Sequence, residues 1–189
     1  LYSVPWPPQG LYFKKPVNSV ADTQGIKFRS YNSATARIAD LMGMAPVQVE
    51  AAELSQALST GVAEAFISSG STGYDRKVWE QLTHFYDTQA WLPRNFVFAN
   101  KGAFDGLNSQ TQNCLRSSGM LAQAAGTARA EQLAGWYLQQ LAANGMTVTA
   151  PSGQLVEDLQ TIGATMAAEW AEAAGAEGSA LVEAYKASK

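Results

Sequence analysis

The residues best suited to bind a ligand lie where predicted strands end. Strand-like patterns cover residues 26–30, 46–49 and 63–67. The first strand ends at Arg29, the second just before Ala51, and the third just before Ser68 and Ser69. Ligands of open parallel sheets bind outside the carboxyl ends of the strands. We therefore expect these four side chains to line one binding edge.

The chemistry of this edge is that of a carboxylate receptor. Asn32 is a good N-cap for the helix expected after the first strand, and that helix would add backbone N–H donors and the positive end of its dipole. The guanidinium of Arg29 is a planar fork that matches a carboxylate. The alternative for Arg29 is an ion pair at the surface or between lobes, and the residues alone leave both readings open.

Other reactive residues favour structural roles. Cys114 and His84 could form a nucleophile pair, but Cys114 lies in a predicted amphipathic helix, where a buried thiol is common. The run 68–73 is predicted to be a plain loop before a helix near residues 75–81, because it lacks the Gly-Lys-Ser/Thr ending and the GxGxxG spacing of phosphate-binding loops. Glu50 and Glu53 fit a solvated helix start. We expect no catalytic residue, no metal site and no cofactor.

Composition limits the classes of partner. The chain has 189 residues and a net charge of -3, and its only adjacent basic pair is Lys14 and Lys15, so no nucleic-acid partner is expected. No apolar stretch reaches the ~20 residues of a membrane span. An anionic ligand would need a local positive site, which favours one buried arginine.

The elements that must position these residues change character along the chain. Strands and short helices alternate from residue 26 to about residue 99, which predicts a mostly parallel α/β sheet. Ser109 and Gln112 have capping-box spacing and open a helix of about 35 residues. Glycines within that helix favour a kink as much as a straight rod. An apolar stripe over residues 155–170 predicts core packing.

Several segments, taken in order, resemble a known family. They are Lys15–Arg29 (KPVNSVADTQGIKFR), Asn32–Thr35, Met42–Val47, Glu53–Gly61 and Asn100–Leu107. The chain is similar over essentially its whole length to solute-binding proteins of the tripartite ATP-independent periplasmic (TRAP) transporters, of the DctP-like, dicarboxylate-binding type. The resemblance implies a two-lobed α/β binding protein whose long C-terminal helix spans both lobes.

The resemblance also implies a domain division. Residues 1–108 would form an α/β ligand-binding lobe with hinge strands, and residues 109–189 would form the spanning helix and C-terminal helices. Family members begin with a substantial part of the first lobe and a secretion signal. We therefore expect the N-terminal part of that lobe to be absent from this chain.

The family's ligand contacts are carried over position by position. Arg29 matches the arginine that forms the salt bridge with the ligand carboxylate, and Ser68 matches a polar contact. Ala51 stands where sialic-acid binders have an aromatic residue, and a further contact falls at Arg94 or Asn95. Near Gln9, some sialic-acid binders have a second arginine, which this chain lacks. The departure at Gln9 disfavours a sialic-acid ligand.

The expected function is a periplasmic, monomeric receptor that captures a small organic acid and delivers it to the TRAP permease subunits. We expect one carboxylate on Arg29 and a partly apolar or aromatic body covered by Trp6, in preference to succinate, malate or sialic acid. The alternatives are a ligand-binding subunit of a sensor system and a small α/β enzyme.

Overall fold

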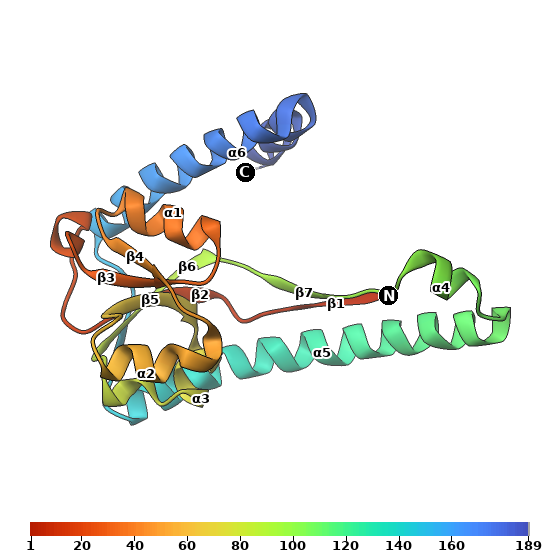
Figure 1. Ribbon diagram of the computed structural model, residues 1–189, viewed down its shortest axis with the longest axis horizontal. Coiled ribbons are helices and arrows are strands. Elements are labelled where there is room, and N and C mark those ends of the chain that lie inside the picture. The colour runs from red at the N-terminus through yellow and green to blue at the C-terminus, as the bar shows by residue number, and fades with distance from the viewer. Residues whose placement is uncertain (189) are drawn as a thin grey trace. The chain divides into compact units, whose positions relative to one another are not determined.

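The computed structural model describes residues 1–188 and has an α/β fold (Figure 1). Two compact units alternate along the chain. The first consists of residues 1–12 and 67–149, and the second of residues 13–66 and the chain from residue 150. The functional division at residue 108 stays a prediction, because compactness does not show which residues bind a ligand.

The strands form a two-stranded ladder and a larger sheet. They are β1 (Tyr2–Pro5), β2 (Gln9–Phe13), β3 (Lys27–Ser30), β4 (Ala45–Gln48), β5 (Ala65–Ser69), β6 (His84–Trp91), β7 (Arg94–Val97) and β8 (Thr147–Thr149). Within residues 1–188 the strand order of the larger sheet is β4-β3-β5-β2-β6-β8. The pairs β3–β4, β3–β5 and β6–β8 are parallel, as the alternating sequence pattern predicts.

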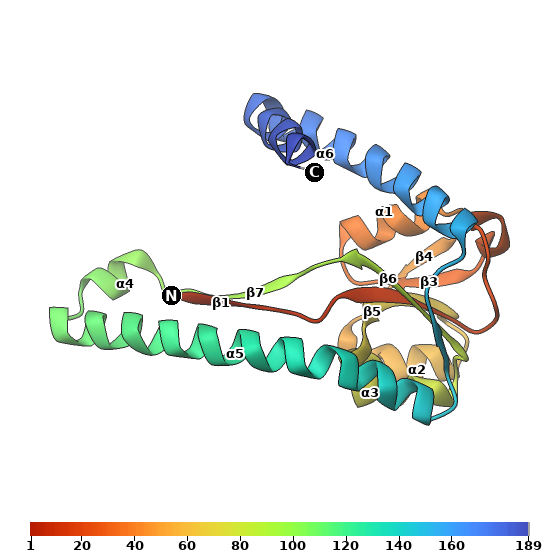
Figure 2. The same ribbon diagram turned by 180° about the vertical axis from the view of Figure 1, so that it is seen from behind.

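In the first unit, a long helix lies beside the antiparallel ladder of β1 and β7 (Figures 1 and 2). This helix is α5 (Ser109–Ala143), and a Cβ added at Gly126 would lie 2.8 Å from Cγ2 of Val4 in β1. The short helix α3 (Gly70–Asp75) packs on α5 near Leu138. The helix α4 (Lys101–Asp105) precedes α5. Small residues on α5 thus allow the ladder to approach closely.

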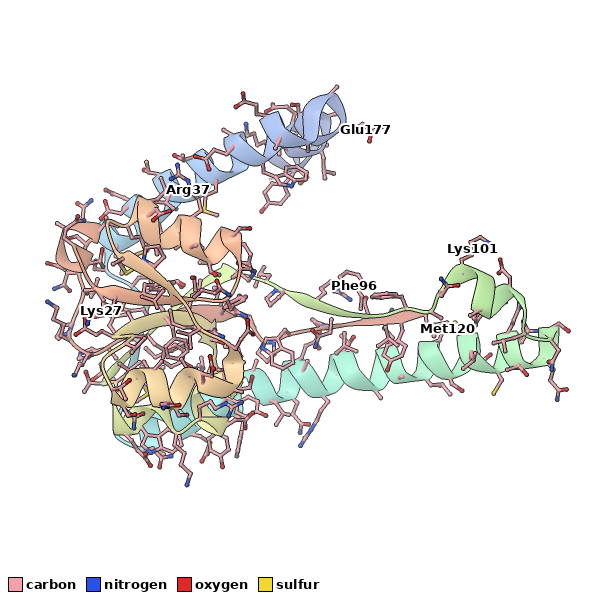
Figure 3. All side chains as sticks on the ribbon, in the orientation of Figure 1. Lys27, Arg37, Phe96, Lys101, Met120 and Glu177 are labelled. Carbon is pink, nitrogen blue, oxygen red and sulfur yellow. The ribbon has the colours of Figure 1, made fainter. Side chains whose placement is uncertain are left out.

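In the second unit, helices α1 (Ser33–Leu41) and α2 (Leu54–Ser59) follow β3 and β4 in the chain. The longer helix α6 (Gly153–Ala187) bends at Gly175, whose φ of 69° and ψ of -152° are accessible to glycine. Arg37 of α1, which is labelled in Figure 3, binds Glu169 of α6 through two nitrogens, with Nη2–Oε1 at 2.6 Å and Nε–Oε2 at 3.1 Å. This exposed ion pair ties α6 to α1.

The serine-rich segment differs from the sequence prediction. Ser68 and Ser69 are the last residues of β5, and Gly70–Asp75 forms helix α3 where a loop was expected. Lys77 has a left-handed conformation, with a φ of 49°, and separates α3 from a 3₁₀ turn at Val78–Glu80. The prediction of a single helix over residues 75–81 is therefore wrong, because the left-handed conformation of Lys77 interrupts it.

The start of α5 also differs from the prediction. Asn108 is the N-cap, and its side chain accepts a hydrogen bond from the Thr111 N–H at 2.8 Å. Gln112 does not close a capping box with Ser109, since its Nε2 donates to the Leu107 and Phe104 carbonyls at 3.0 and 3.1 Å. Beyond this start, α5 is continuous through its glycines.

The apolar stripe of α6 is buried only in its first half. Leu155 and Ile162 are buried, whereas Trp170 is 49% exposed. The prediction of core packing thus holds for the beginning of α6 and is wrong for Trp170. None of the helices in residues 1–188 has the length and apolar character that crossing a membrane requires.

Candidate ligand-binding site

Arg29 has a fixed orientation inside the second unit. It lies in β3 with 4% of its surface exposed, and its Nε donates to the Val49 carbonyl at 2.8 Å. Its Cζ lies 4.9 Å from the centroid of the Tyr31 ring. A guanidinium has five N–H donors, and Nε supplies only one. The two terminal nitrogens remain suited to a bidentate bond with a carboxylate.

The charge of Arg29 lies in a poorly hydrated position. Burial lowers the pKa of Arg29, while the neighbouring Tyr31 and Glu50 raise it. Among residues 1–188, Arg29 forms no salt bridge. A buried cation is costly without an anionic partner. An anion that reached this guanidinium would therefore be bound strongly.

Two further candidates, Ala51 and Asn32, lie on segments next to Arg29. Asn32 is close to Arg29 in the sequence, and Ala51 follows Val49, which bonds Arg29. Val49, whose carbonyl holds Arg29, donates its N–H to Ser30 at 3.1 Å, and the exposed Ala51 follows two residues later. Asn32 is exposed and caps α1, with its Oδ1 accepting from the Thr35 N–H at 2.8 Å. The capping role of Asn32 is confirmed, and its contact with a ligand stays a prediction.

Three candidates meet in the first unit. The indole Nε1 of Trp6 donates to Ser69 Oγ at 2.8 Å, and Ser69 caps α3. Ser69 is fully buried and also bonds Ser71 Oγ at 2.8 Å. Ser68, 5% exposed, donates its hydroxyl to Thr72 Oγ1 at 2.8 Å. These hydroxyls form a network at the end of β5, which joins Trp6 to the start of α3.

The remaining candidates lie on β2 and β7 of the first unit. Gln9 is buried at 6% exposure and already has a partner. Arg94 is exposed, and its Nη2 donates to Ser3 Oγ at 3.1 Å. Arg94 and Trp6 line one cavity of about 480 Å³. Asn95 is exposed and stands opposite Val4 in the β1–β7 ladder.

Sequence reasoning missed two residues that shape these clusters. Tyr31 stacks on Arg29, and the two-residue spacing that puts side chains on one face of a strand could have indicated it. Thr72 receives the Ser68 hydroxyl, and the spacing Ser69-x-x-Thr72 is that of a helix cap. In the part of the chain that the structure describes, no group of three or more His, Cys, Asp or Glu residues could hold a metal ion.

Comparison with known families and structures identifies close relatives of this chain. Residues 10–175 match the family model DctP, described as bacterial extracellular solute-binding protein, family 7. A solved TRAP solute-binding protein from an unidentified marine microbe, specific for pyroglutamate and crystallised with co-purified pyroglutamate, is 59% identical. The match covers 98% of this chain and 61% of that protein, with a TM-score of 0.93.

Two receptors of Bordetella pertussis that bind pyroglutamic acid are also similar. DctP6 is 46% identical with a TM-score of 0.94, and DctP7 is 42% identical with a TM-score of 0.93. Each match covers 98% of this chain and 62% of the receptor. This chain thus spans about three fifths of the length of the relatives that it matches.

Proposed function

Because this chain belongs to family 7 of the bacterial extracellular solute-binding proteins, the DctP family, we propose that it is part of a periplasmic receptor of a TRAP transporter. The receptor captures pyroglutamate, or a closely similar small cyclic monocarboxylate, and delivers it to the membrane permease subunits. It carries out no chemical conversion of this ligand.

The observation that carries the proposal is the state of Arg29. The side chain is buried, held through Nε by the Val49 carbonyl and covered by the Tyr31 ring. These contacts leave the two terminal nitrogens for an anion, and the guanidinium is already ordered before the anion arrives. Preorganisation of this kind reduces the entropy lost on binding. A monocarboxylate satisfies this one cation without adding a second buried charge.

Pyroglutamate is the specific ligand that the relatives favour. Three proteins that are 42–59% identical to this chain bind it, one of them with ligand retained through purification. Pyroglutamate has one carboxylate, a small ring with an apolar side, and one lactam group. This chemistry agrees with the expected single carboxylate and partly apolar body, with a compact lactam ring as that body instead of an aromatic group.

We assign the other candidate residues secondary roles in this receptor. Ser68, Gln9 and Asn95 are polar side chains that suit the lactam N–H and carbonyl. Ala51 provides space, and Arg94 is an exposed second cation whose Nη2 already donates to Ser3 Oγ. Neutral hydrogen bonds contribute about 0.5–1.5 kcal/mol each, so loss of any one should weaken binding about two- to tenfold.

Ligand identification on the full-length protein tests the proposal. Protein purified without added ligand is denatured, and the released small molecules are identified by mass spectrometry. Calorimetry with pyroglutamate is then performed on protein that has been unfolded, dialysed and refolded. We expect pyroglutamate in the first experiment and stoichiometric binding in the second. Absence of pyroglutamate binding to the refolded protein would overturn the proposal.

The same preparation separates a receptor from an enzyme. Prolonged incubation of the protein with pyroglutamate should return the compound unchanged. Accumulation of glutamate, the product of lactam hydrolysis, would instead indicate an enzyme. A receptor that serves a sensor would bind pyroglutamate equally well, but deletion of its gene would leave pyroglutamate uptake by the cell intact.

A further inference from the structure

Trp6 is held by two hydrogen bonds in the first unit, one from its backbone and one from its indole ring. Its backbone N–H donates to the Pro93 carbonyl at 2.9 Å, and its side-chain Nε1 donates to Ser69 Oγ at 2.8 Å. The ring is nevertheless 39% exposed. Trp6 therefore presents a ring of fixed orientation to its surroundings.

The single polar group of this ring is already used. An indole has one N–H donor and no acceptor, and here that donor is bonded to Ser69. Trp6 can therefore contact a ligand only through the aromatic face and the C–H edge of its ring. The ring also lines the cavity of about 480 Å³, whose walls are mostly proline, leucine and alanine side chains, with Arg94 and Glu131 as the two charged residues. The surface around Trp6 is thus largely apolar.

Ser69 has little bonding capacity left for a ligand. A hydroxyl has one donor and two acceptor positions. Its oxygen accepts from Trp6 Nε1 and caps the Thr72 N–H at 3.5 Å, and it shares a hydrogen bond with Ser71 Oγ at 2.8 Å. Since Ser69 is also fully buried, it can act on a ligand only through the residues that it holds.

From these contacts we infer that Trp6 determines ligand specificity and that Ser69 is the residue that positions it. The inference rests on the proposed function. The fixed apolar ring accepts the methylene side of a small cyclic acid such as pyroglutamate. It disfavours polyhydroxy acids, because their hydroxyl groups would lose water against the indole without gaining a partner. Ser69 shapes this preference without touching the ligand.

A double-mutant cycle on the full-length protein tests this assignment. Trp6→Phe keeps an aromatic ring but removes the N–H, and Ser69→Ala removes its acceptor. We expect Ser69→Ala alone to weaken pyroglutamate binding about two- to tenfold, as loss of one hydrogen bond predicts. In the Trp6→Phe background, the same Ser69→Ala change should alter affinity less than twofold. Losses that simply multiply would overturn the inference.

Stability and specificity provide readouts that a merely structural role would not reproduce. Ser69→Ala also removes the cap of α3, so it should lower thermal stability both in the wild type and in Trp6→Phe. It should lower ligand affinity only in the wild type. Ser71→Ala is the matched control, since Ser71 bonds Ser69 but not Trp6, and its affinity should stay near that of the wild type. In Trp6→Ala, the ratio of the gluconate to the pyroglutamate dissociation constant should fall at least threefold. An unchanged ratio would overturn the inference.

A ligand-free measurement separates this inference from the proposed function. The indole N–H signal of Trp6 is identified in nitrogen–proton correlation spectra by its loss in Trp6→Phe. Ser69→Ala should shift this signal and speed its exchange with solvent, and an unchanged signal would overturn the positioning role. Failure of the wild type to bind pyroglutamate would overturn the proposed function. If the wild type binds pyroglutamate but Trp6→Phe and Ser69→Ala change affinity independently, the inference is overturned and the proposed function is not.

Discussion

At the scale of single residues, Arg29 should dominate ligand affinity. Arg29→Ala leaves a bound carboxylate without its partner, a loss that costs about 3–5 kcal/mol, or about 10²–10⁴-fold in dissociation constant. Arg29→Lys should recover little, because an ammonium cannot donate two parallel bonds and has no planar guanidinium to place over the Tyr31 ring. Calorimetry with pyroglutamate on the full-length protein measures both changes.

Arg37 provides the control for this experiment. It lies on α1 of the same unit, but its guanidinium is exposed and paired with Glu169. Exposed ion pairs contribute about 0–1 kcal/mol to stability, so Arg37→Ala should leave affinity within twofold of the wild type. Near-wild-type affinity of Arg29→Ala, or an equal loss in Arg37→Ala, would contradict the role of Arg29.

Tyr12 should make the protein sensitive to alkaline pH. Burial raises its pKa well above the ordinary value of about 10, against a smaller opposite effect of a hydrogen bond to the Gly73 backbone. The folded protein therefore retains the phenol proton more strongly than the unfolded chain. Unfolding releases this proton above about pH 10, so the free energy of unfolding falls as the pH rises through that range.

The Tyr12→Phe variant tests this linkage. Near neutral pH it should be less stable by about 1–3 kcal/mol, because the buried Ser69 carbonyl loses the Tyr12 hydroxyl at 2.8 Å. Above about pH 10 the difference should shrink, since the variant lacks the titrating group. Urea unfolding of both proteins between pH 7 and pH 11 measures the two slopes, and parallel slopes would refute the prediction.

The sequence indicates single residues well where chain-local rules determine them. Arg29 falls at a strand end, and Asn32 caps α1, because both depend on neighbours within a few residues. The bond between Trp6 and Ser69 joins residues 63 positions apart, and no local rule identifies it. The ligand contacts of Arg29, Ser68 and Asn95 stay predictions, since they depend on a molecule that the sequence does not specify.

At the scale of elements, the glycines of α5 have different roles. A Cβ at Gly126 would lie 2.8 and 3.2 Å from the two Val4 methyl carbons, whereas a Cβ at Gly135 would meet nothing within 4 Å. Gly126→Ala should lower the free energy of unfolding by about 1–2 kcal/mol, because the stiff Val4 side chain must move. Gly135→Ala should raise it by about 0.5–1 kcal/mol through helix propensity.

Urea unfolding of the full-length protein compares these two alanine variants. Val4→Ala is the rescue, since it removes both methyl groups that face Gly126. In the Val4→Ala background, Gly126→Ala should no longer be destabilising. Equal effects of alanine at Gly126 and Gly135 would show that close approach of β1 does not require glycine in α5.

Element boundaries show where sequence patterns are insufficient. The long helix is predicted almost to the residue at its end, but its N-cap is Asn108 because this side chain, one residue earlier than Ser109, reaches the Thr111 N–H. Helix α3 was missed because serine and glycine over residues 68–73 are typical of loops. Burial against α5 and the Ser69 cap stabilise a short helix that has weak propensity of its own.

At the scale of the whole molecule, the family is easier to predict than the ligand. An ordered set of motifs from Lys15 to Leu107 identified the DctP type, and the family model confirms it over residues 10–175. The α/β fold follows from the same alternation of strands and helices. Ligand identity depends on the few side chains that contact the ligand, and this chain spans about three fifths of the length of the relatives that it matches.

A panel of small acids should therefore rank ligands by their carboxylate and ring. Binding at 100 times the dissociation constant stabilises the folded state by about 2.7 kcal/mol, which corresponds to a rise in melting temperature of roughly 5–10 °C. We expect this shift for pyroglutamate and smaller shifts for branched 2-oxo acids. Succinate and malate should give almost none, because a second carboxylate would be desolvated and the other candidate cation, Arg94, is exposed and bonded to Ser3. Sialic acid is disfavoured by the absence of a second arginine near Gln9.

The decisive comparison within this panel is between pyroglutamate and 2-pyrrolidinone. The two share the lactam ring, but 2-pyrrolidinone lacks the carboxylate that Arg29 is proposed to hold. If the guanidinium supplies most of the affinity, 2-pyrrolidinone should give no shift at a concentration that saturates with pyroglutamate. L-proline, which keeps the carboxylate but has a charged secondary ammonium in place of the neutral lactam, should fall between them. A shift of equal size with 2-pyrrolidinone would mean that the ring is the anchor, because the charge of Arg29 then has no part in binding.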